Sequence, residues 1–420
     1  MKTYKTLKTL LRVLTLALIT SGIQAQTQPD SLTIKLQQAF THESLPGMYV
    51  IMTDGNKVSY SHSFGYADEA NQVPYLANTI QNIGSVSKTV IAVALMKAIE
   101  LKYFTLETDI NDVLPFKVTN PNDPNGKITI RQLTNHTSGI VDNPEIYHYC
   151  YHFYPKLRAY DSISIKTLNQ MGFGDKLKDT TLAQFFYNYL SPQGQYYSKA
   201  NFGEGPAGSV SSYSNIGSAL AAYLIELKSG LSYAEFTQKY ILKPLKMDHS
   251  GWHIQDVDLK KHAYLYLDLK NRFPLYDLVT YPDGGLKTSP EDLSKYLMAI
   301  ARHDKKLLTK ASYQAMFTPQ FSKEHPPKNI NLTYRNKGIF WNLYTNGTIG
   351  HDGDDPGVGT YLFFNSSTGK GGLFLTNKYL PNKQAIVDVL VKEQRGNRPG
   401  RGAVITLINH IIARSNRREA

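Results

Sequence analysis

Strand-like segments lie near both ends of the chain, and apolar helical segments lie between them. The segments 48–52 and 58–64 flank Asp54-Gly55, a dipeptide that favours a tight hairpin turn between strands. Late in the chain, segments 360–364 and 372–376 have the composition of two consecutive antiparallel strands. The pattern predicts an α+β fold in which both chain ends build one antiparallel sheet, flanked by helices and joined to a helical region.

Apolar residues recur at helical spacing over residues 86–101, and a second such segment runs from about 217 to 228 and stops at Gly230. Shorter helices are expected within 27–45, near 181–190, and at 382–393 and 402–413. The remainder of 141–200 is rich in tyrosine and has no clear periodicity. We interpret it as a long, variable surface insertion that forms one wall of a cleft.

Composition excludes several classes of protein. Among 420 residues, 41% are hydrophobic and 19% charged, which rules out wholesale disorder. The single cysteine, Cys150, rules out an internal disulfide framework, a thiolate zinc finger and an iron–sulfur cluster. The formal net charge is +12, but residues 1–25 carry four of these charges and residues 395–420 a net five, which leaves +3 on residues 26–394. The body of the chain therefore gives no support for nucleic-acid binding.

The first 25 residues have the pattern of a secretory signal peptide. Basic residues precede an apolar run at 13–19, and the small residue Ala25 suits the last position before cleavage. The run is too short to span a membrane, and an uncleaved anchor is the alternative interpretation. We therefore expect an exported, periplasmic or secreted protein with no transmembrane span, a domain at 26–394, and a basic C-terminal segment at 395–420.

The sharpest chemical motif is Gly84-Ser85-Val86-Ser87-Lys88-Thr89, an S-x-x-K sequence that opens the helix at 86–101. Residues three apart on a helix share a face, so the Ser85 hydroxyl and the Lys88 amine can meet. The helix start adds unpaired N–H groups and a positive potential that favours a developing anion. A lysine can take the serine proton only if burial or neighbouring cations lower its pKa.

Two further motifs follow in order, Tyr213-Ser214-Asn215 and His351-Asp352-Gly353. With S-x-x-K they give the series S-x-x-K, Y-x-N and H-x-G, and segments 132–139 and 283–289 frame them. This series resembles that of the serine β-lactamase and penicillin-binding-protein superfamily. The tyrosine of the second motif, in place of serine, resembles the motif of the class C branch. The resemblance covers about residues 40–380 and implies a β-lactamase/transpeptidase-like fold.

The resemblance also implies roles for individual residues. Ser85 would be the nucleophile, Lys88 would share its proton, and Tyr213 would be the base or a proton relay, a phenolate beside an ammonium being favoured by charge. Which of Lys88 and Tyr213 carries the proton stays open, because coupled groups titrate together. Asn215 would hydrogen-bond the substrate amide and Lys88, and the backbone N–H groups of Ser85 and Asp354 would form the oxyanion hole. No metal and no cofactor is implied.

The third motif departs from the Lys-Thr-Gly of the β-lactamases. We expect His351, Asp352 and Gly353 to contact substrate, and Asp352, if it faces the cleft, to repel a carboxylate and favour an amine or a neutral group. H-x-G is similar to esterases and D-amino-acid peptidases of the superfamily. The expected partner is thus a small-molecule or peptide substrate, with cell-wall fragments among the candidates. A true class C β-lactamase and a non-hydrolytic penicillin-binding sensor or cell-wall-binding protein are the alternatives.

Weaker motifs are better explained by structure than by chemistry. The glycine-rich segment 203–208 follows no predicted strand, so we reject dinucleotide binding. His148 and His152 have metal-like spacing but no further ligand. Cys150 has no paired base and is a poor candidate nucleophile beside Ser85.

Overall fold

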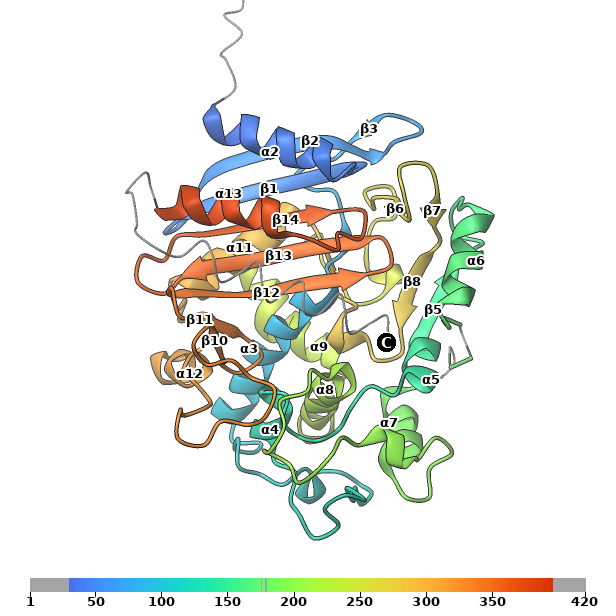
Figure 1. Ribbon diagram of the computed structural model, residues 1–420, viewed down its shortest axis with the longest axis vertical. Helices are drawn as coiled ribbons and strands as arrows, with labels where there is room; N and C mark the ends of the chain where they lie inside the picture. Colours follow the sequence, from blue (N-terminus) through green and yellow to red (C-terminus); the bar gives the residue numbers. More distant parts are fainter. Residues whose placement is uncertain (1–29, 175, 178–179, 396–420) are drawn as a thin grey trace, which may run out of the picture.

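The computed structural model describes residues 30–174, 176–177 and 180–395. The expected signal peptide, the helix expected at 402–413 and the basic segment beyond Arg395 lie outside the described residues. Figure 1 shows one large antiparallel sheet above a region of helices. This arrangement confirms the α+β architecture predicted from the distribution of strand and helix patterns.

The sheet has eight strands in the described residues, and each neighbouring pair is antiparallel. In spatial order they are β10 (Arg335–Lys337), β11 (Asn342–Tyr344), β12 (Thr348–Asp355), β13 (Val358–Asn365), β14 (Gly371–Thr376), β1 (Gly47–Asp54), β2 (Lys57–Asp68) and β3 (Val73–Pro74). The predicted hairpin is β1–β2, with Gly55 at φ 64° in the turn. Strand β1 also pairs with β14, so the two chain ends meet in the sheet as expected.

Strand alternation gives the sheet two different apolar faces. On β1, Met48, Val50 and Met52 point to the face covered by helices α2 (Ser31–His42) and α13 (Gln384–Arg395), which pack together there (Figure 1). Tyr49 and Ile51 point to the opposite face and join the main core. That second face packs on α11 (Pro290–Ala301) and on the helical region, so the site described below lies where sheet and helices meet.

Helices α3 (Ser87–Glu100) and α8 (Asn215–Ser229) form the centre of the helical region and pack on each other. They confirm the two helices predicted from apolar spacing. Eleven of the 14 residues of α3 are buried, because the helix is surrounded by other elements. Ser214 caps the start of helix α8, where its hydroxyl accepts from Gly217 N–H, and Gly230 in the left-handed conformation caps its end.

The segment 141–200 is more ordered than its sequence indicates. It contains α5 (Pro144–Tyr147), β5 (Tyr151–Tyr154), α6 (Ser162–Gln170) and α7 (Leu182–Leu190). Only α7 was expected, and a capping box between Thr181 and Gln184 fixes its start. Strand β5 pairs with the distant β8 (Leu275–Leu278), a contact that local periodicity cannot reveal.

Short elements complete the described chain: α4 (Ile130–Thr134), α9 (Tyr233–Thr237), α10 (Lys243–Leu245), α12 (Lys310–Met316), β4 (Gln81–Asn82) paired with β9 (Lys287–Thr288), and β6 (Leu265–Tyr266) paired with β7 (Arg272–Phe273).

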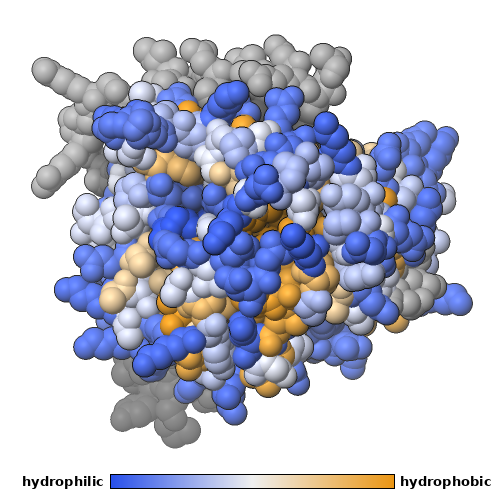
Figure 2. All heavy atoms as spheres, turned by 90° about the horizontal axis from the view of Figure 1, so that it is seen from below, coloured by the Kyte–Doolittle hydropathy of each residue, from blue (hydrophilic) through white to orange (hydrophobic). Residues whose placement is uncertain are grey.

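None of the described helices is both long and apolar enough to cross a membrane. Figure 2 shows the end where α4 and α7 lie: its surface is mostly hydrophilic, with hydrophobic residues gathered toward the centre.

A buried ion pair joins β9 to β8, and we predict that breaking it destabilises the fold. Lys287 Nζ lies 2.6 Å from Asp277 Oδ1, and the lysine side chain is fully buried. Burial alone raises the pKa of Asp277, but Lys287, with smaller contributions from Ile254 N–H and His253, holds it below the ordinary value. Lys287→Met leaves an unpaired buried carboxylate and should lower the free energy of unfolding by about 3–5 kcal/mol.

Urea unfolding measures this loss. Lys370→Met is the matched control, because Lys370 faces Asp54 in an exposed pair at 3.5 Å and its loss should cost less than about 1 kcal/mol. Equal stability losses in the two variants would contradict the importance of the buried pair.

Candidate active site

Ser85 lies in a tight turn, Gly84–Val86, that leads directly into α3. Two glycines bring this turn against β12. Gly84 has φ 53°, and a Cβ placed on it would lie 2.8 Å from the backbone nitrogen of Asp354. A Cβ on Gly353 would lie 2.1 Å from the carbonyl oxygen of Ile83. The close approach therefore requires glycine at both positions, and it places the backbone of Asp354 beside the turn that carries Ser85.

Lys88 lies one turn into α3, and its ammonium group is completely enclosed. Nζ donates to Ser85 Oγ at 3.0 Å, to Asn215 Oδ1 at 2.6 Å and to the carbonyl oxygen of Asp283 at 2.6 Å. A lysine has three such positions. Two of these positions face the oxygen atoms of Asn215 and Asp283, which can only accept a hydrogen bond. When Lys88 loses a proton, the resulting lone pair must therefore take the third position, which faces Ser85.

The surroundings of Lys88 favour that change. Desolvation lowers the pKa of Lys88 below its ordinary value, while the carboxylates of Asp283 and Asp142 oppose the shift. Burial has the larger effect. A neutral amine would keep its bonds to Asn215 and Asp283 and accept the Ser85 proton.

Asn215 is oriented by Asp142, a residue that the motifs did not identify. Asp142 Oδ2 accepts from both the backbone N–H and the side-chain amide of Asn215, each at 2.9 Å, and Oδ1 accepts from Ile216 N–H at 2.9 Å. Because Asp142 holds the amide nitrogen, the amide oxygen of Asn215 must point to Lys88. Asp142 thus caps the start of α8 and fixes one Lys88 acceptor.

Tyr213 stands at the mouth of the site, with 40% of its surface exposed. Its ring lies 5.1 Å from Lys88 Nζ and packs on His136 at 4.6 Å between ring centroids. Desolvation of the hydroxyl raises the pKa of Tyr213 well above 10, more than a hydrogen bond to Ser85 lowers it, and nearby carboxylates raise it further. The resting group is therefore a neutral phenol and not the phenolate that charge alone would favour.

His351 is buried and neutral. Its Nδ1 donates to the carbonyl oxygen of Asp352 at 2.6 Å, and desolvation lowers its pKa to about 4. The enclosed position therefore leaves His351 without a charge at neutral pH.

Asp352 does not face Ser85. It pairs with Tyr361, which belongs to the apolar cluster beneath α2 and α13, whereas His351 pairs with Leu362 of the main core. The expected substrate contact by the Asp352 side chain therefore does not fit the strand register. Asp354 shares the outer direction and forms an ion pair with Lys383, so only its backbone is turned toward the Ser85 turn.

Two further carboxyl groups lie close to Lys88 and were missed as site residues. Tyr147 donates to Asp283 Oδ1 at 3.1 Å, and Tyr151 donates to Asp355 Oδ1 at 2.5 Å. Desolvation raises the pKa of Asp283 to about 6 and that of Asp355 to about 7. Both tyrosines come from segment 141–200. Asp283 opens the framing segment 283–289 and Asp355 ends β12, but neither position indicated a role by itself.

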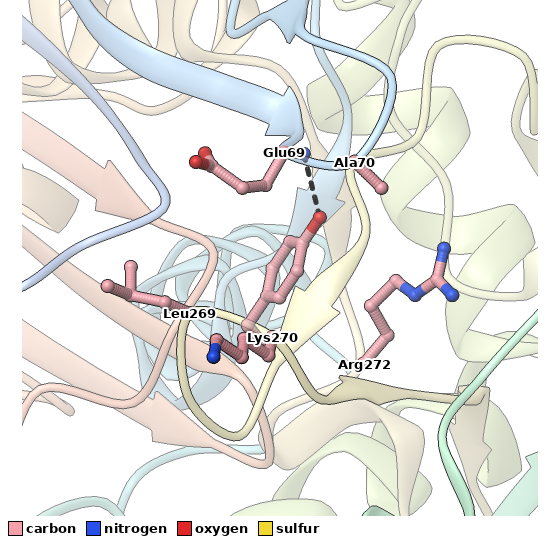
Figure 3. A pocket seen from close by; sticks show the side chains of 6 residues that line it. Glu69, Ala70, Leu269, Lys270 and Arg272 are labelled. Atoms are coloured by element: carbon pink, nitrogen blue, oxygen red, sulfur yellow. Dashed lines mark hydrogen bonds between the residues drawn. The ribbon is translucent and has the colours of Figure 1, made fainter.

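The remaining candidates do not add a site. No group of three or more His, Cys, Asp or Glu residues suited to a metal ion is found in the described part of the chain. Cys150 is fully buried, and desolvation raises its thiol pKa, which makes it a poor nucleophile. A surface pocket of about 290 Å³ between the end of β2 and the β6–β7 hairpin is lined by Glu69, Lys270 and Arg272 among others (Figure 3). It contains none of the motif residues.

The comparisons with known proteins agree with the predicted resemblance. A family model described as Beta-lactamase matches residues 34–395. Penicillin-binding protein 4* of Bacillus subtilis (strain 168) is 25% identical over 346 residues, which cover 78% of this chain and 67% of that protein. Protein flp of Staphylococcus aureus (strain MRSA252) is 24% identical over 258 residues, which cover 60% of this chain but only 45% of that protein.

Solved structures confirm the fold. The octameric penicillin-binding protein homologue from Pyrococcus abyssi has a TM-score of 0.69 at 23% identity, and the match covers 88% of this chain and 78% of that one. A class C beta-lactamase has a TM-score of 0.64 at 20% identity, with 91% and 99% covered. At these identities the likeness shows a shared β-lactamase/transpeptidase-like fold.

The neutral state of His351 predicts a loss of stability in acid. The folded pKa is about 4, below the ordinary 6.5, so between these values the unfolded chain binds more protons than the folded one. Stability should therefore fall as the pH falls from 6.5 to 4, by up to about 3 kcal/mol from this group. Buried His136 and His262 are shifted in the same direction.

Urea unfolding at pH 7 and pH 5 tests this effect. Between pH 7 and pH 5 the free energy of unfolding of His351→Asn should fall by about 2 kcal/mol less than that of wild type, because the titrating group is gone. His42→Asn, at an exposed position of α2, is the control and should match wild type. An unchanged pH dependence in His351→Asn would show that the imidazole is not held neutral.

Proposed function

The chain belongs to the beta-lactamase family, and we propose on that basis that it is an exported serine hydrolase working through an acyl-enzyme on Ser85. Its proposed substrate is an ester, or a peptide or amide that contains a D-amino acid. The observation that carries this proposal is the enclosed Lys88, whose Nζ lies 3.0 Å from Ser85 Oγ and has its other two positions occupied by acceptors.

In the proposed reaction, Ser85 Oγ attacks the substrate carbonyl carbon as its proton passes to neutral Lys88. The oxyanion is stabilised by the N–H groups of Ser85 and Asp354, each worth about 3 kcal/mol in comparable sites. Tyr213, a phenol at rest, relays a proton from Lys88 to the leaving group. Water then enters, gives up a proton along the same groups, and releases the acid from Ser85.

The preference for an ester or amide over a β-lactam rests on the charges around Ser85. A β-lactam carries a carboxylate, which requires a cation near the third motif. Here His351 is neutral, Lys88 has no free position, and buried Lys337, which is close enough to His351 to lower its pKa, donates to Asn342 Oδ1 at 2.8 Å. The two additional carboxyl groups, Asp283 and Asp355, make the site less suited to an anionic substrate.

A non-hydrolytic penicillin-binding sensor is the second candidate, because two of the relatives are named penicillin-binding proteins. Such a protein would be acylated and then hold the acyl group. The presence of Ser85, Lys88, Tyr213 and Asn215 in one connected network favours turnover.

A substrate panel tests the proposed function. We expect purified protein to hydrolyse short acyl esters or D-alanyl peptides with many turnovers, cephalosporins at least tenfold more slowly, and Ser85→Ala to lose at least about 1,000-fold in kcat/KM. Stable acylation by a β-lactam without release would support the sensor instead. Efficient cephalosporin turnover with poor ester turnover would indicate a true class C β-lactamase.

A further inference from the structure

Asp355 lies on the same face of β12 as His351 and Gly353, because it is four residues beyond His351 and two beyond Gly353 along the strand. It is half-buried, and Tyr151 donates to its Oδ1 at 2.5 Å. No described residue donates a hydrogen bond to its other oxygen, Oδ2. The carboxyl group is therefore fixed in place by one oxygen, and the second is available.

The free oxygen of Asp355 lies close to the turn that carries Ser85. A Cβ placed on Gly284 would lie 3.4 Å from Asp355 Oδ2 and 3.8 Å from the carbonyl carbon of Gly84. Asp355 Oδ2 and the Ser85 turn are therefore neighbours on either side of Gly284, which has no side chain to separate them.

A second carboxyl group independently indicates a missing partner. Asp283 is 1% exposed, its Oδ1 accepts from Tyr147, and a hydrogen bond from Thr280 lowers its pKa, but its buried Oδ2 has no partner in full hydrogen-bond geometry among the described residues. Asp283 is near enough to Asp355 to raise the pKa of that carboxyl group. A buried carboxyl group without a full set of partners is costly unless a cation compensates it.

The cations of the site do not provide this compensation. Lys88 uses all three positions on Ser85, Asn215 and the backbone of Asp283. Asp142 is satisfied by the start of α8, so Asp283 and Asp355, whose pKa values burial raises, are the carboxyl groups that a further cation would hold in the ionised form.

The position of Tyr213 indicates which part of the substrate meets Asp355. Tyr213 lies beside His351, with ring centroids 6.4 Å apart, whereas Asp355 lies beyond Asp354 at the other end of this segment of β12. In the proposed function Tyr213 protonates the leaving group, which therefore leaves on the His351 side. The acyl part then extends toward Asp355.

We propose that Asp355, supported by Tyr151 and Asp283, binds a protonated amine on the acyl part of the substrate. This inference rests on the proposed function and narrows it: the substrates are aminoacyl esters or amides with a free amine near the scissile carbonyl group. The ammonium is bound and not consumed, so hydrolysis adds one water and yields the free amino acid and the alcohol or amine.

A pair of matched esters tests the proposal. The 4-nitrobenzyl esters of alanine, in both enantiomers, and of isobutyric acid differ by an ammonium in place of a methyl group. At pH 7 we expect kcat/KM of wild type for one alanyl ester to exceed that for the isobutyryl ester at least tenfold. Asp355→Asn should reduce this ratio at least tenfold, while Asp54→Asn, an exposed carboxylate at the β1–β2 turn, should keep the wild-type ratio.

The outcomes separate the two proposals. Hydrolysis of the isobutyryl ester with no preference for either alanyl ester overturns the amine site but leaves the serine hydrolase standing. If wild type hydrolyses neither these esters nor D-alanyl peptides, the proposed function itself is overturned. An α-ammonium group also activates an ester by induction, so the wild-type ratio is divided by the ratio of the hydroxide-catalysed rates of the same esters. The corrected ratio needs no variant and keeps the test decisive if Asp355→Asn does not fold.

Discussion

The enclosed amine of Lys88 is the interaction on which the rest of the site depends. It joins three parts of the chain that are distant in sequence: the Ser85 turn, the start of α8 through Asn215, and the segment that carries Asp283. Each partner fixes one direction of the amine. Burial makes its proton easier to remove, and the fixed geometry directs the resulting lone pair to Ser85.

The sheet contributes to the site mainly by bringing the backbone of β12 close to the Ser85 turn, and less by the chemistry of its side chains. Gly84 and Gly353 let β12 approach the Ser85 turn more closely than any residue with a Cβ would allow. The same register turns the side chains of Asp352 and Asp354 away and presents their backbone. The segment from His351 to Asp355 looks strongly charged in the sequence. At the site, however, it presents mainly backbone groups, together with a neutral histidine and one carboxyl group, that of Asp355.

The sequence was sufficient for the fold and for the centre of the site. Hairpin chemistry at Asp54-Gly55 and apolar spacing over 86–101 are local signals, and the structure agrees with both. The meeting of Ser85 with Lys88 follows from helical spacing, whereas the proximity of Asn215 to Lys88 was implied by the family resemblance.

What the sequence could not supply depends on long-range contacts. Asp142 and Asp283 reach Lys88 only because α8 and the segment before β9 pack against α3, and Tyr151 reaches Asp355 through the β5–β8 pairing. The side chain of Asp352 was assigned to the cleft because strand composition does not reveal register. The charge state of Tyr213 was misjudged for a related reason, since desolvation is set by tertiary packing.

The most direct test of the Lys88 network is the rate at which a fluorophosphonate labels Ser85. Lys88→Met keeps the side-chain length and removes the amine, so the labelling rate should fall at least about 100-fold relative to wild type. Peptide mass spectrometry should place the wild-type label on Ser85, and circular dichroism should show that the variant is folded. A folded Lys88→Met protein that is labelled at the wild-type rate would contradict activation of Ser85 by the buried amine.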